Sequence, residues 1–244
     1  MIKSMPEKKL VSIIIPTYNE AENVGDVLKR AISVLDGNGG IKYEILVIDD
    51  DSSDNTVGVA QEVLGEKGRA IRRIADIKSL SLSVLGGIKE ARGDIIVIMD
   101  GDGSHPPELI PTFIKNIKEG CDLVIGSRYI RGGGTVNFPL SRKIVSRFAC
   151  FLGRLVSNVK DNTSGFLGIK TSALEGVVLT PSGFKIGLEI FVKARVSQFK
   201  EVPYVFVNRV KGKSKLKTKT AIEYICQIFG LFKYKISKDK KVCS

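Results

Sequence analysis

The sequence predicts an α/β protein with a mainly parallel central sheet flanked by helices. Between residues 10 and 126, short β-branched runs alternate with polar turns and with segments whose apolar residues recur at helical spacing. The runs are apolar almost without interruption, which is typical of parallel strands covered by helices on both faces. With 244 residues, of which 43% are hydrophobic, the chain can bury the core of one sizeable domain.

Five strands are expected in the first half of the chain, with helices between them. The strand segments are Leu10–Ile15, Tyr43–Ile48, Ala70–Ile74, Asp94–Met99 and Asp122–Ile125. Apolar residues at helical spacing predict one helix from Val24 to Leu35 and another from Val57 to Leu64. This order gives repeated β-α-β units, in which successive strands run parallel.

The pattern changes after residue 126. The glycine run Arg131–Gly134 predicts a flexible loop, and a helix is expected from about Leu140 to Ser157. A shorter strand and helix follow. Glu201–Asn208 then predicts a late strand, and Lys219–Ile236 predicts a final amphipathic helix.

Composition excludes several classes of function. No run reaches the roughly 18 uncharged apolar residues of a membrane-spanning helix, and no signal-peptide pattern is present, so we expect the chain to stay inside the cell. The four cysteines include no CxxC pair and His105 is the single histidine, so a Cys/His zinc site is not expected. A catalytic triad with a histidine base would have to use His105.

The chain carries a formal net charge of +12, concentrated near its end. Eleven Lys and Arg residues lie between Arg209 and Ser244, against two acidic residues. Such an excess favours a phosphate-bearing partner, which is a nucleotide, a nucleic acid or an anionic membrane surface. A nucleic acid is not expected, because the chain has no tryptophan and the tail has few interleaved aromatic residues to stack on bases.

Acidic residues follow three of the predicted strands. Glu20 comes after the first strand, Asp49–Asp51 after the second, and Asp100 with Asp102 after the fourth. In an open parallel sheet, ligands bind outside the carboxyl ends of the strands. We therefore expect a ligand site at this edge of the sheet.

The aspartate run 49–51 has two interpretations. Aspartates commonly cap a helix or close a turn. A capping interaction uses one carboxylate, however, and three adjacent negative charges repel one another. We therefore expect at least one of these aspartates to contact a ligand hydroxyl, a base or a cation.

Asp100 and Asp102 are candidates for a metal site. Carboxylates at i and i+2 on a turn can converge on a hard cation such as Mg²⁺ or Mn²⁺, which keeps water and phosphate oxygens as further ligands. Gly101 between them allows close approach of a ligand. The alternative is a solvated turn. His105 is either a third metal contact or a polar residue near the next helix start.

Several motifs together resemble family 2 glycosyltransferases, which have the GT-A fold. The early ones are PTYNE (16–20), DDDSSDNT (49–56), MDGDGSHPPE (99–108) and GSRY (126–129). The later ones are RKIVS (142–146), DNTSGF (161–166), PSGFKIGLEI (181–190) and RVKGKSKLK (209–217), and these resemble dolichyl-phosphate mannose synthases, especially archaeal ones.

The resemblance implies an inverting transfer of mannose from GDP-mannose to a dolichyl (polyprenyl) phosphate, assisted by Mg²⁺ or Mn²⁺. By motif position, the guanosine end of the donor would be held by Pro16, Tyr18, Glu20, Ile48 and Asp50. Asp100 and Asp102 would bind the metal, with Gly101 between them, and Ser104 stands where relatives often have a metal-linked glutamine.

The same resemblance assigns the remaining roles. Arg128 would lie near the donor, and Arg142 and Ser146 would receive the acceptor phosphate. A mobile loop closing over the diphosphate would contain Arg209, Lys211, Ser214 and Lys215. The catalytic roles would fall to Asp102, Arg128, Arg209 and Lys215. The acceptor phosphate is largely a dianion at pH 7, so its oxygen needs little help from a general base.

We expect a catalytic domain at 1–208, with a nucleotide-sugar half at about 10–126 and an acceptor half at about 127–208. Residues 209–244 would form a basic loop and an amphipathic helix on the cytoplasmic face of a membrane, reached peripherally or through a separate membrane protein. A helix that only packs on the core is the alternative.

Other activities are also consistent with some of these features. The main alternative is glucosyl transfer from UDP-glucose to the same lipid. Transfer to a protein or polysaccharide is disfavoured by the RKIVS and GKSK motifs, and an inactive lipid-binding scaffold is disfavoured by the presence of Asp100, Asp102 and Arg209.

Overall fold

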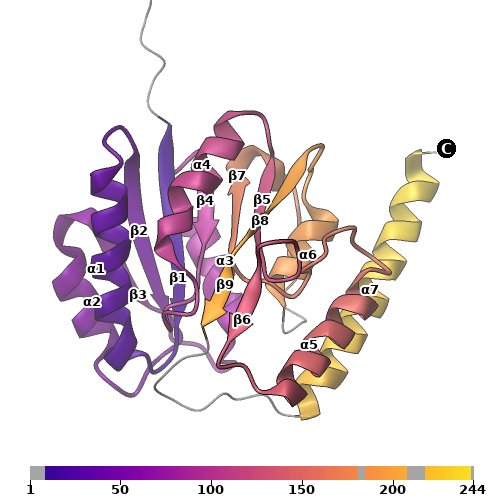
Figure 1. The fold of residues 1–244 in the computed structure, drawn as a ribbon, viewed down its shortest axis with the longest axis horizontal. Helices are drawn as coiled ribbons and strands as arrows, with labels where there is room; N and C mark the ends of the chain where they lie inside the picture. Colours follow the sequence, from indigo (N-terminus) through magenta and orange to yellow (C-terminus); the bar gives the residue numbers. More distant parts are fainter. Residues whose placement is uncertain (1–8, 181–184, 208–217, 243–244) are drawn as a thin grey trace, which may run out of the picture.

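A computed structural model describes residues 9–180, 185–207 and 218–242 and shows a seven-stranded sheet with helices on both faces (Figure 1). The strands are β1 (Leu10–Thr17), β2 (Lys42–Asp49), β3 (Gly68–Arg72), β4 (Ile95–Ile98), β5 (Leu123–Ser127), β6 (Gly134–Val136), β7 (Leu167–Lys170), β8 (Phe199–Pro203) and β9 (Val205–Val207). The α-helices are α1 (Ala21–Gly37), α2 (Thr56–Leu64), α3 (Leu80–Glu90), α4 (Ile110–Lys118), α5 (Leu140–Gly153), α6 (Ile186–Lys193) and α7 (Thr218–Val242). Short 3₁₀ turns are η1 (Gly65–Lys67), η2 (Pro107–Leu109) and η3 (Thr171–Leu174).

The central sheet has the strand order β3-β2-β1-β4-β7-β5-β8. Strand β7 runs antiparallel to both of its neighbours, and the other pairs in this sheet are parallel. A second, two-stranded sheet pairs β6 with β9. The prediction of a mainly parallel sheet flanked by helices is therefore confirmed.

Two apolar cores lie on opposite faces of the sheet because side chains alternate along each strand. On β1, Ile13 and Ile15 enter one core together with residues of α1, α2 and α4. Ile14 enters the other core, with residues of α3 and α6. All three isoleucines are fully buried, so β1 is covered on both faces as its unbroken apolar run indicates.

The third strand begins and ends earlier than the predicted Ala70–Ile74. It covers Gly68–Arg72, and the side chain of Ile74 is 82% exposed. Arg73 forms an ion pair with Asp50 and donates a hydrogen bond to the Ile77 carbonyl oxygen at 2.8 Å. These polar contacts direct the chain away from the sheet. Because β3 is an edge strand that pairs only with β2, its early end disrupts no hydrogen bonds to a second neighbouring strand.

The predicted late strand 201–208 is divided into two strands at Tyr204. Strand β8 pairs with β5 and β9 pairs with β6, so the two pieces belong to different sheets. The backbone N–H of Tyr204 donates to the Ser127 carbonyl, and the Tyr204 carbonyl accepts from the N–H of Gly134. Gly134 thus begins a strand, although the glycine run predicted only a loop.

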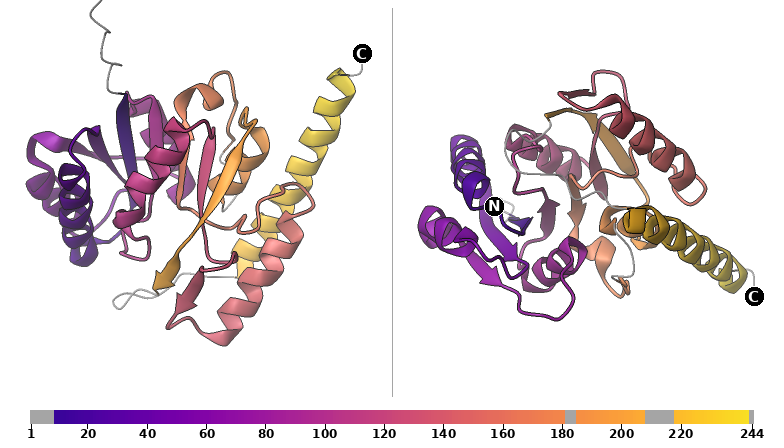
Figure 2. Two further views of the ribbon diagram at one scale, coloured as in Figure 1. Left: turned by 45° about the horizontal axis from the view of Figure 1, so that its top comes forward. Right: turned by 90° about the horizontal axis from the view of Figure 1, so that it is seen from below.

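Helices α5 and α7 lie at the end of the molecule farthest from α1 and α2 (Figure 1). The helix predicted at 140–157 ends at Gly153, and the final helix is longer than the predicted 219–236. Tyr224, Ile228 and Leu231 of α7 share a small core with Val156 and Leu188, while the C-terminal part of α7 extends away from the rest of the fold (Figure 2). Within the described ranges, no helix combines the length and apolarity needed to cross a membrane.

Candidate active site

The carboxyl ends of β1, β2 and β4 share one edge of the sheet, at the bottom of Figure 1. The three acidic loops predicted from the sequence follow these strands. In the register of β1 and β2, Pro16 lies beside Ile48 and Thr17 beside Asp49. Parallel pairing therefore brings the aspartate run next to the PTYNE segment.

The turn after β4 carries Asp100 and Asp102. The N–H of Ser104 donates a hydrogen bond of 3.0 Å to the carboxylate of Asp102. Gly101 is buried, and a Cβ atom there would lie 2.9 Å from the Thr17 methyl group, so a side chain would displace the turn from β1. The side chain of Asp100 is 43% exposed, which leaves its carboxylate accessible to a ligand.

The turn has the donor set of a small divalent-metal site. The Ser104 hydroxyl is buried and has no hydrogen-bond partner in the part of the chain that the structure describes. An unsatisfied buried hydroxyl on the same turn as two carboxylates fits a bound cation or its water. No cluster of three or more His, Cys, Asp or Glu side chains forms a metal site among the described residues. The remaining ligands of a cation here would therefore be water and substrate oxygens.

The buried side chain of His105 stabilises this turn. Its Nδ1 accepts a hydrogen bond of 2.9 Å from the Asp100 N–H, so the proton of the neutral ring is on Nε2. The ring stacks on Phe166 with 4.9 Å between centroids and meets Tyr204 edge-on. Burial lowers the pKa of His105, although Asp100 and Asp102 oppose this shift. In this tautomer neither nitrogen offers a lone pair to a metal, so His105 is a supporting residue.

The three aspartates after β2 have three different environments. Asp49 is buried and accepts hydrogen bonds from the Thr17 hydroxyl at 3.0 Å and from the Ser52 N–H at 2.8 Å, so it closes the turn. Asp50 forms an ion pair with Arg73. Asp51 pairs with Arg72, and the Arg72 Nε–Oδ1 distance is 2.8 Å. Asp49 therefore fits the turn-closing interpretation, while contact of Asp50 or Asp51 with a ligand stays a prediction.

The other residues predicted to contact the nucleoside lie near this loop. The ammonium group of Lys78 lies 5.1 Å from the centre of the Tyr18 ring, and the Glu20 carboxylate accepts a 2.8 Å hydrogen bond from Asn23. Ile48 lies beside Pro16 near the end of β2, and its buried side chain packs in the core with Val84. Its contact with a nucleoside stays a prediction.

Arg128 lies at the end of β5 in a buried ion pair. Its Nε and Nη2 donate to the two carboxylate oxygens of Asp161 at 2.8 and 2.7 Å, and Nη2 also donates to the Thr163 hydroxyl. Burial opposes the charged forms, but the pair interaction prevails, so the pKa of Arg128 is raised and that of Asp161 is lowered. The positive charge of Arg128 is thus already compensated by Asp161.

The predicted acceptor residues occupy successive turns of α5. Arg142 and Ser146 are four residues apart and therefore lie on the same side of the helix. The guanidinium of Arg142 stacks on Phe138 at 4.9 Å from the ring centre. The Tyr129 hydroxyl donates a 2.8 Å hydrogen bond to Ser146, and Tyr129 also stacks with Arg128. Tyr129 therefore joins α5 to the end of β5.

Part of the predicted site cannot be placed. Arg209, Lys211, Ser214 and Lys215 lie outside the described residues. The structure in turn identifies site residues to which the sequence analysis assigned no role. These are Arg73, Lys78 and Asp161, which contact Asp50, Tyr18 and Arg128 respectively. Asp161 lies within a quoted motif, but its partner Arg128 is distant in the sequence, so no local pattern indicates the contact.

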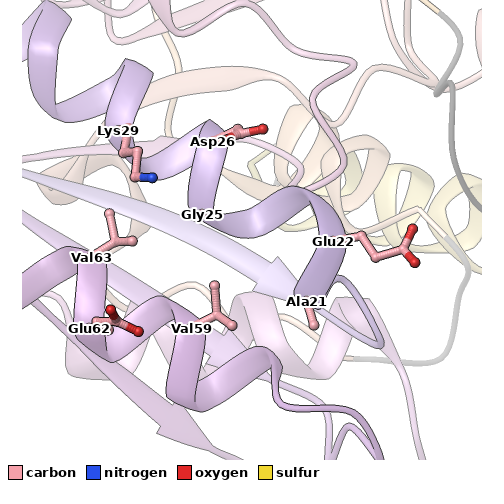
Figure 3. A pocket seen from close by; sticks show the side chains of 8 residues that line it. All are labelled: Ala21, Glu22, Gly25, Asp26, Lys29, Val59, Glu62 and Val63. Atoms are coloured by element: carbon pink, nitrogen blue, oxygen red, sulfur yellow. The ribbon is translucent and has the colours of Figure 1, made fainter.

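A separate open groove of about 500 Å³ lies between α1 and α2 (Figure 3). Val59 and Val63 of α2 approach Gly25 of α1, where a Cβ atom would lie 3.3 Å from Val59. None of the predicted site residues lines this groove. It is a seam of close helix packing rather than part of the site.

The sequence and fold match known proteins over most of the chain. The profile of the family described as Glycosyl transferase family 2 matches residues 12–177. A dolichol-phosphate mannosyltransferase of Pyrococcus furiosus is 44% identical over 95% of this chain, which spans 66% of that protein's length. A Saccharomyces cerevisiae protein of the same name is 31% identical over 95% of this chain and 90% of its own length.

Solved structures with a similar fold are more distant in sequence. Glucosyl-3-phosphoglycerate synthase from Mycobacterium tuberculosis, in complex with phosphoglyceric acid, has a TM-score of 0.68 at 18% identity, over 91% of this chain and 80% of that one. A complex of the same enzyme with Mn²⁺, UDP-glucose and phosphoglyceric acid also has a TM-score of 0.68, at 17% identity, over 93% and 79% of the two chains. With its α/β sheet, its acidic loops at one edge and its match over residues 12–177, the chain belongs to glycosyl transferase family 2 and is a glycosyltransferase with the GT-A fold.

Proposed function

We propose that this protein transfers mannose from GDP-mannose to a dolichyl or other polyprenyl phosphate, with inversion at the anomeric carbon. The observation that carries the proposal is the Asp100–Ser104 turn, whose two carboxylates and unsatisfied buried hydroxyl lie at the sheet edge that also holds Asp50. The choice of mannose as the sugar and of a lipid phosphate as the acceptor is supported by the relatives named dolichol-phosphate mannosyltransferase.

Asp100 and Asp102 would hold Mg²⁺ or Mn²⁺, with Ser104 in its outer shell. The bound ion supplies Lewis-acid stabilisation of the negative charge that grows on the departing diphosphate. The named Mn²⁺ complexes of proteins with this fold are compatible with such a site. Arg209 and Lys215 are proposed to add positive charge from the basic segment.

The chain needs no general base for this reaction. The acceptor phosphate has a second pKa near 6, so it attacks as a dianion at pH 7. The single histidine is buried and neutral and is bonded to the Asp100 backbone, which agrees with a mechanism that does not use it as a base. Arg142 and Ser146 on α5 would receive the acceptor phosphate by charge-assisted hydrogen bonds, which reduces repulsion between the two phosphate groups.

A lipid acceptor would explain why two stripes of apolar residues are exposed on the protein surface. On α5 and the turn that follows it, the residues are Leu140, Ile144, Phe148, Phe151 and Leu155, each at least 60% exposed. On α7, they are Ile222, Ile225, Phe229, Phe232 and Ile236, each at least 44% exposed. Clusters of exposed large apolar residues mark an interaction surface, and their helical spacing gives each helix one apolar face.

We propose that these stripes lie on a membrane surface. Exposed basic residues accompany them, among which are Arg147, Arg154, Lys233 and Lys235. Apolar side chains with neighbouring lysines and arginines suit the interface of an anionic leaflet. The protein would then act peripherally on the cytoplasmic face, with or without a separate membrane protein.

A donor and acceptor screen tests the proposal. Purified protein is incubated with Mn²⁺, a polyprenyl phosphate and either GDP-mannose or UDP-glucose, and sugar in the organic phase is measured. Transfer from GDP-mannose is expected. Transfer from UDP-glucose alone would replace the donor but keep the lipid acceptor, and no lipid product from either would contradict the proposal.

A further inference from the structure

Tyr129 connects the end of β5 to helix α5. It is the second residue after β5, and its hydroxyl donates a 2.8 Å hydrogen bond to the hydroxyl oxygen of Ser146 on α5. The two residues are 17 positions apart in the sequence. Tyr129 therefore reaches from the central sheet to one of the two residues that are proposed to receive the acceptor phosphate.

The ring of Tyr129 is held by charged neighbours. The guanidinium carbon of Arg128 lies 5.1 Å from the ring centre, and that of Arg147 lies 5.8 Å from it. Both distances are within the range of cation–π attraction. Arg128 is itself fixed by its buried bidentate ion pair with Asp161. The buried framework at the end of β5 thus determines where the Tyr129 hydroxyl lies.

Core packing does not fix the part of α5 that carries Ser146. The buried residues of α5 are Cys150 and Gly153, which both come after Ser146 in the helix. Ile144 and Phe148, which lie two residues before and after Ser146, are 61% and 60% exposed. The hydrogen bond from Tyr129 therefore ties a weakly packed turn of α5 to the sheet.

Arg142, the other proposed acceptor residue, is also linked to Arg128 through aromatic rings. Its guanidinium carbon lies 4.9 Å from the centre of the Phe138 ring. Phe138 meets Phe206 of β9 edge-on, with 5.5 Å between ring centres, and the Arg128 guanidinium carbon lies 5.6 Å from the Phe206 ring. Both proposed acceptor residues are thus connected to Arg128 by aromatic side chains.

We propose that Tyr129 is a positioning residue for the lipid acceptor, because it holds the Ser146 hydroxyl in the orientation that donates to a phosphate oxygen. The contact between Ser146 and the acceptor rests on the proposed function. A helical serine can instead donate its proton to the carbonyl oxygen four residues earlier. A hydrogen bond from Tyr129 fixes the Ser146 oxygen and leaves its proton for the ligand. The two hydroxyls then form a chain in which each donates to the next group, which strengthens the bond to phosphate.

This role predicts a specific kinetic signature. Burial raises the pKa of Tyr129, so its phenol keeps the proton that it donates at neutral pH. The hydroxyl acts through Ser146, so its loss should weaken acceptor binding equally in the ground state and in the transition state. Such a loss raises the Michaelis constant for the acceptor and leaves kcat unchanged.

Steady-state kinetics of Tyr129→Phe test the assignment, because this variant keeps the ring and loses only the hydroxyl. Full-length proteins are assayed with Mn²⁺, GDP-mannose and a polyprenyl phosphate dissolved in detergent, so that membrane binding does not enter the Michaelis constant. Tyr43→Phe is the matched control, because its hydroxyl donates a 2.7 Å hydrogen bond to Asp36 at the other end of the sheet. We expect Tyr129→Phe to raise the KM for the polyprenyl phosphate about five- to tenfold, as for the loss of one hydrogen bond. Its kcat, its KM for GDP-mannose and all constants of the control should match wild type.

Each outcome of these assays has a distinct meaning. If wild type forms no lipid-linked sugar, the proposed function fails. If wild type is active and Tyr129→Phe has the same acceptor KM, only the assignment of Tyr129 fails. An equal rise in the KM for GDP-mannose would show a general disturbance of the site and would overturn the assignment to the acceptor. A fall in kcat with an unchanged acceptor KM would do the same.

A double-mutant cycle tests whether Tyr129 acts through Ser146. Ser146→Ala removes the hydroxyl that accepts from Tyr129, and Ser146→Thr keeps a hydroxyl at this position. We expect Tyr129→Phe to raise the acceptor KM in the wild-type and Ser146→Thr backgrounds but not further in the Ser146→Ala background. Independent, additive rises in the acceptor KM for Tyr129→Phe and Ser146→Ala would overturn the positioning role.

Discussion

Arg128 and Asp161, which are 33 residues apart in the sequence, form a bidentate ion pair that is almost completely removed from water. Asp161 also accepts a 2.9 Å hydrogen bond from the Arg128 N–H, so the pair fixes both the side chain and the backbone at the end of β5. It thereby anchors the DNTSGF segment, whose Gly165 lies against Asp100. A residue expected to act on the donor is thus part of the framework that shapes the donor site.

Asp161→Ala should destabilise the protein strongly, because it leaves the Arg128 charge buried and unpaired. Loss of one partner of a buried pair costs about 3–5 kcal/mol in the free energy of unfolding. Urea denaturation measures this cost. Glu108→Ala is the matched control, because its pair with Arg30 is exposed and should contribute little. A similar cost for both variants would contradict this account of the pair.

Stability should fall in acid partly through Glu44. This carboxylate is buried and accepts hydrogen bonds from the Ser12 hydroxyl at 2.7 Å and from the Arg92 N–H at 2.8 Å. Burial opposes ionisation, but the contacts with Arg92 and Ser12 prevail and lower the pKa of Glu44.

The sign of the pH effect follows from this lowered pKa. The stabilisation is complete above the unfolded pKa of about 4.3 and is lost as the pH falls through the folded pKa, because the unfolded chain then binds the proton more readily. Urea denaturation between pH 7 and pH 3 should show a shallower loss of stability below pH 5 in Glu44→Gln than in wild type. Equal slopes would show that Glu44 does not contribute.

Asp102→Asn should abolish metal-dependent binding of the nucleotide. Loss of a residue that only supports a ligand typically costs about 10–100-fold in metal affinity or activity, and the loss of a proposed direct ligand should exceed that. Mn²⁺ binding followed by electron paramagnetic resonance and turnover are measured together. Asp26→Asn, at an exposed position on α1, should leave both unchanged. Full turnover in Asp102→Asn would refute the metal assignment.

The exposed stripes of α5 and α7 should each contribute to membrane binding. Phe148→Ser and Phe229→Ser should each weaken binding to anionic phospholipid vesicles about tenfold, because each removes a buried aromatic contact from the interface. Co-sedimentation measures this. Ile74→Ser removes an even more exposed apolar residue outside the two stripes and should have no effect. An effect as large in this control would mean that binding is not localised to α5 and α7.

The sequence indicates the strands well because β-branched runs such as Ile13–Ile15 are buried on both faces and leave a strong local signal. Because the ends of these strands are clear in the sequence, the sheet edge that carries the acidic loops could be predicted as well. The end of β3 and the break at Tyr204 were predicted wrongly because they depend on contacts with Asp50 and Ser127, which are remote in the chain.

The roles within the site were harder to predict for a similar reason. Nothing local distinguishes Asp49, which closes a turn, from Asp50, which pairs with Arg73. The amphipathic pattern of α7 indicates an apolar face but not the hydrogen bonds of Gln227 to Lys185, since these join residues 42 positions apart. Polar contacts between distant segments emerge only when the fold is known.

The central claim is most directly tested by measuring GDP release and lipid-linked mannose in one reaction mixture. Purified protein, Mn²⁺, GDP-mannose and a polyprenyl phosphate are combined, and both products are followed with time. The proposed single displacement predicts equal amounts of the two, and neither product without the polyprenyl phosphate. Release of GDP with no mannose on the lipid would contradict the account.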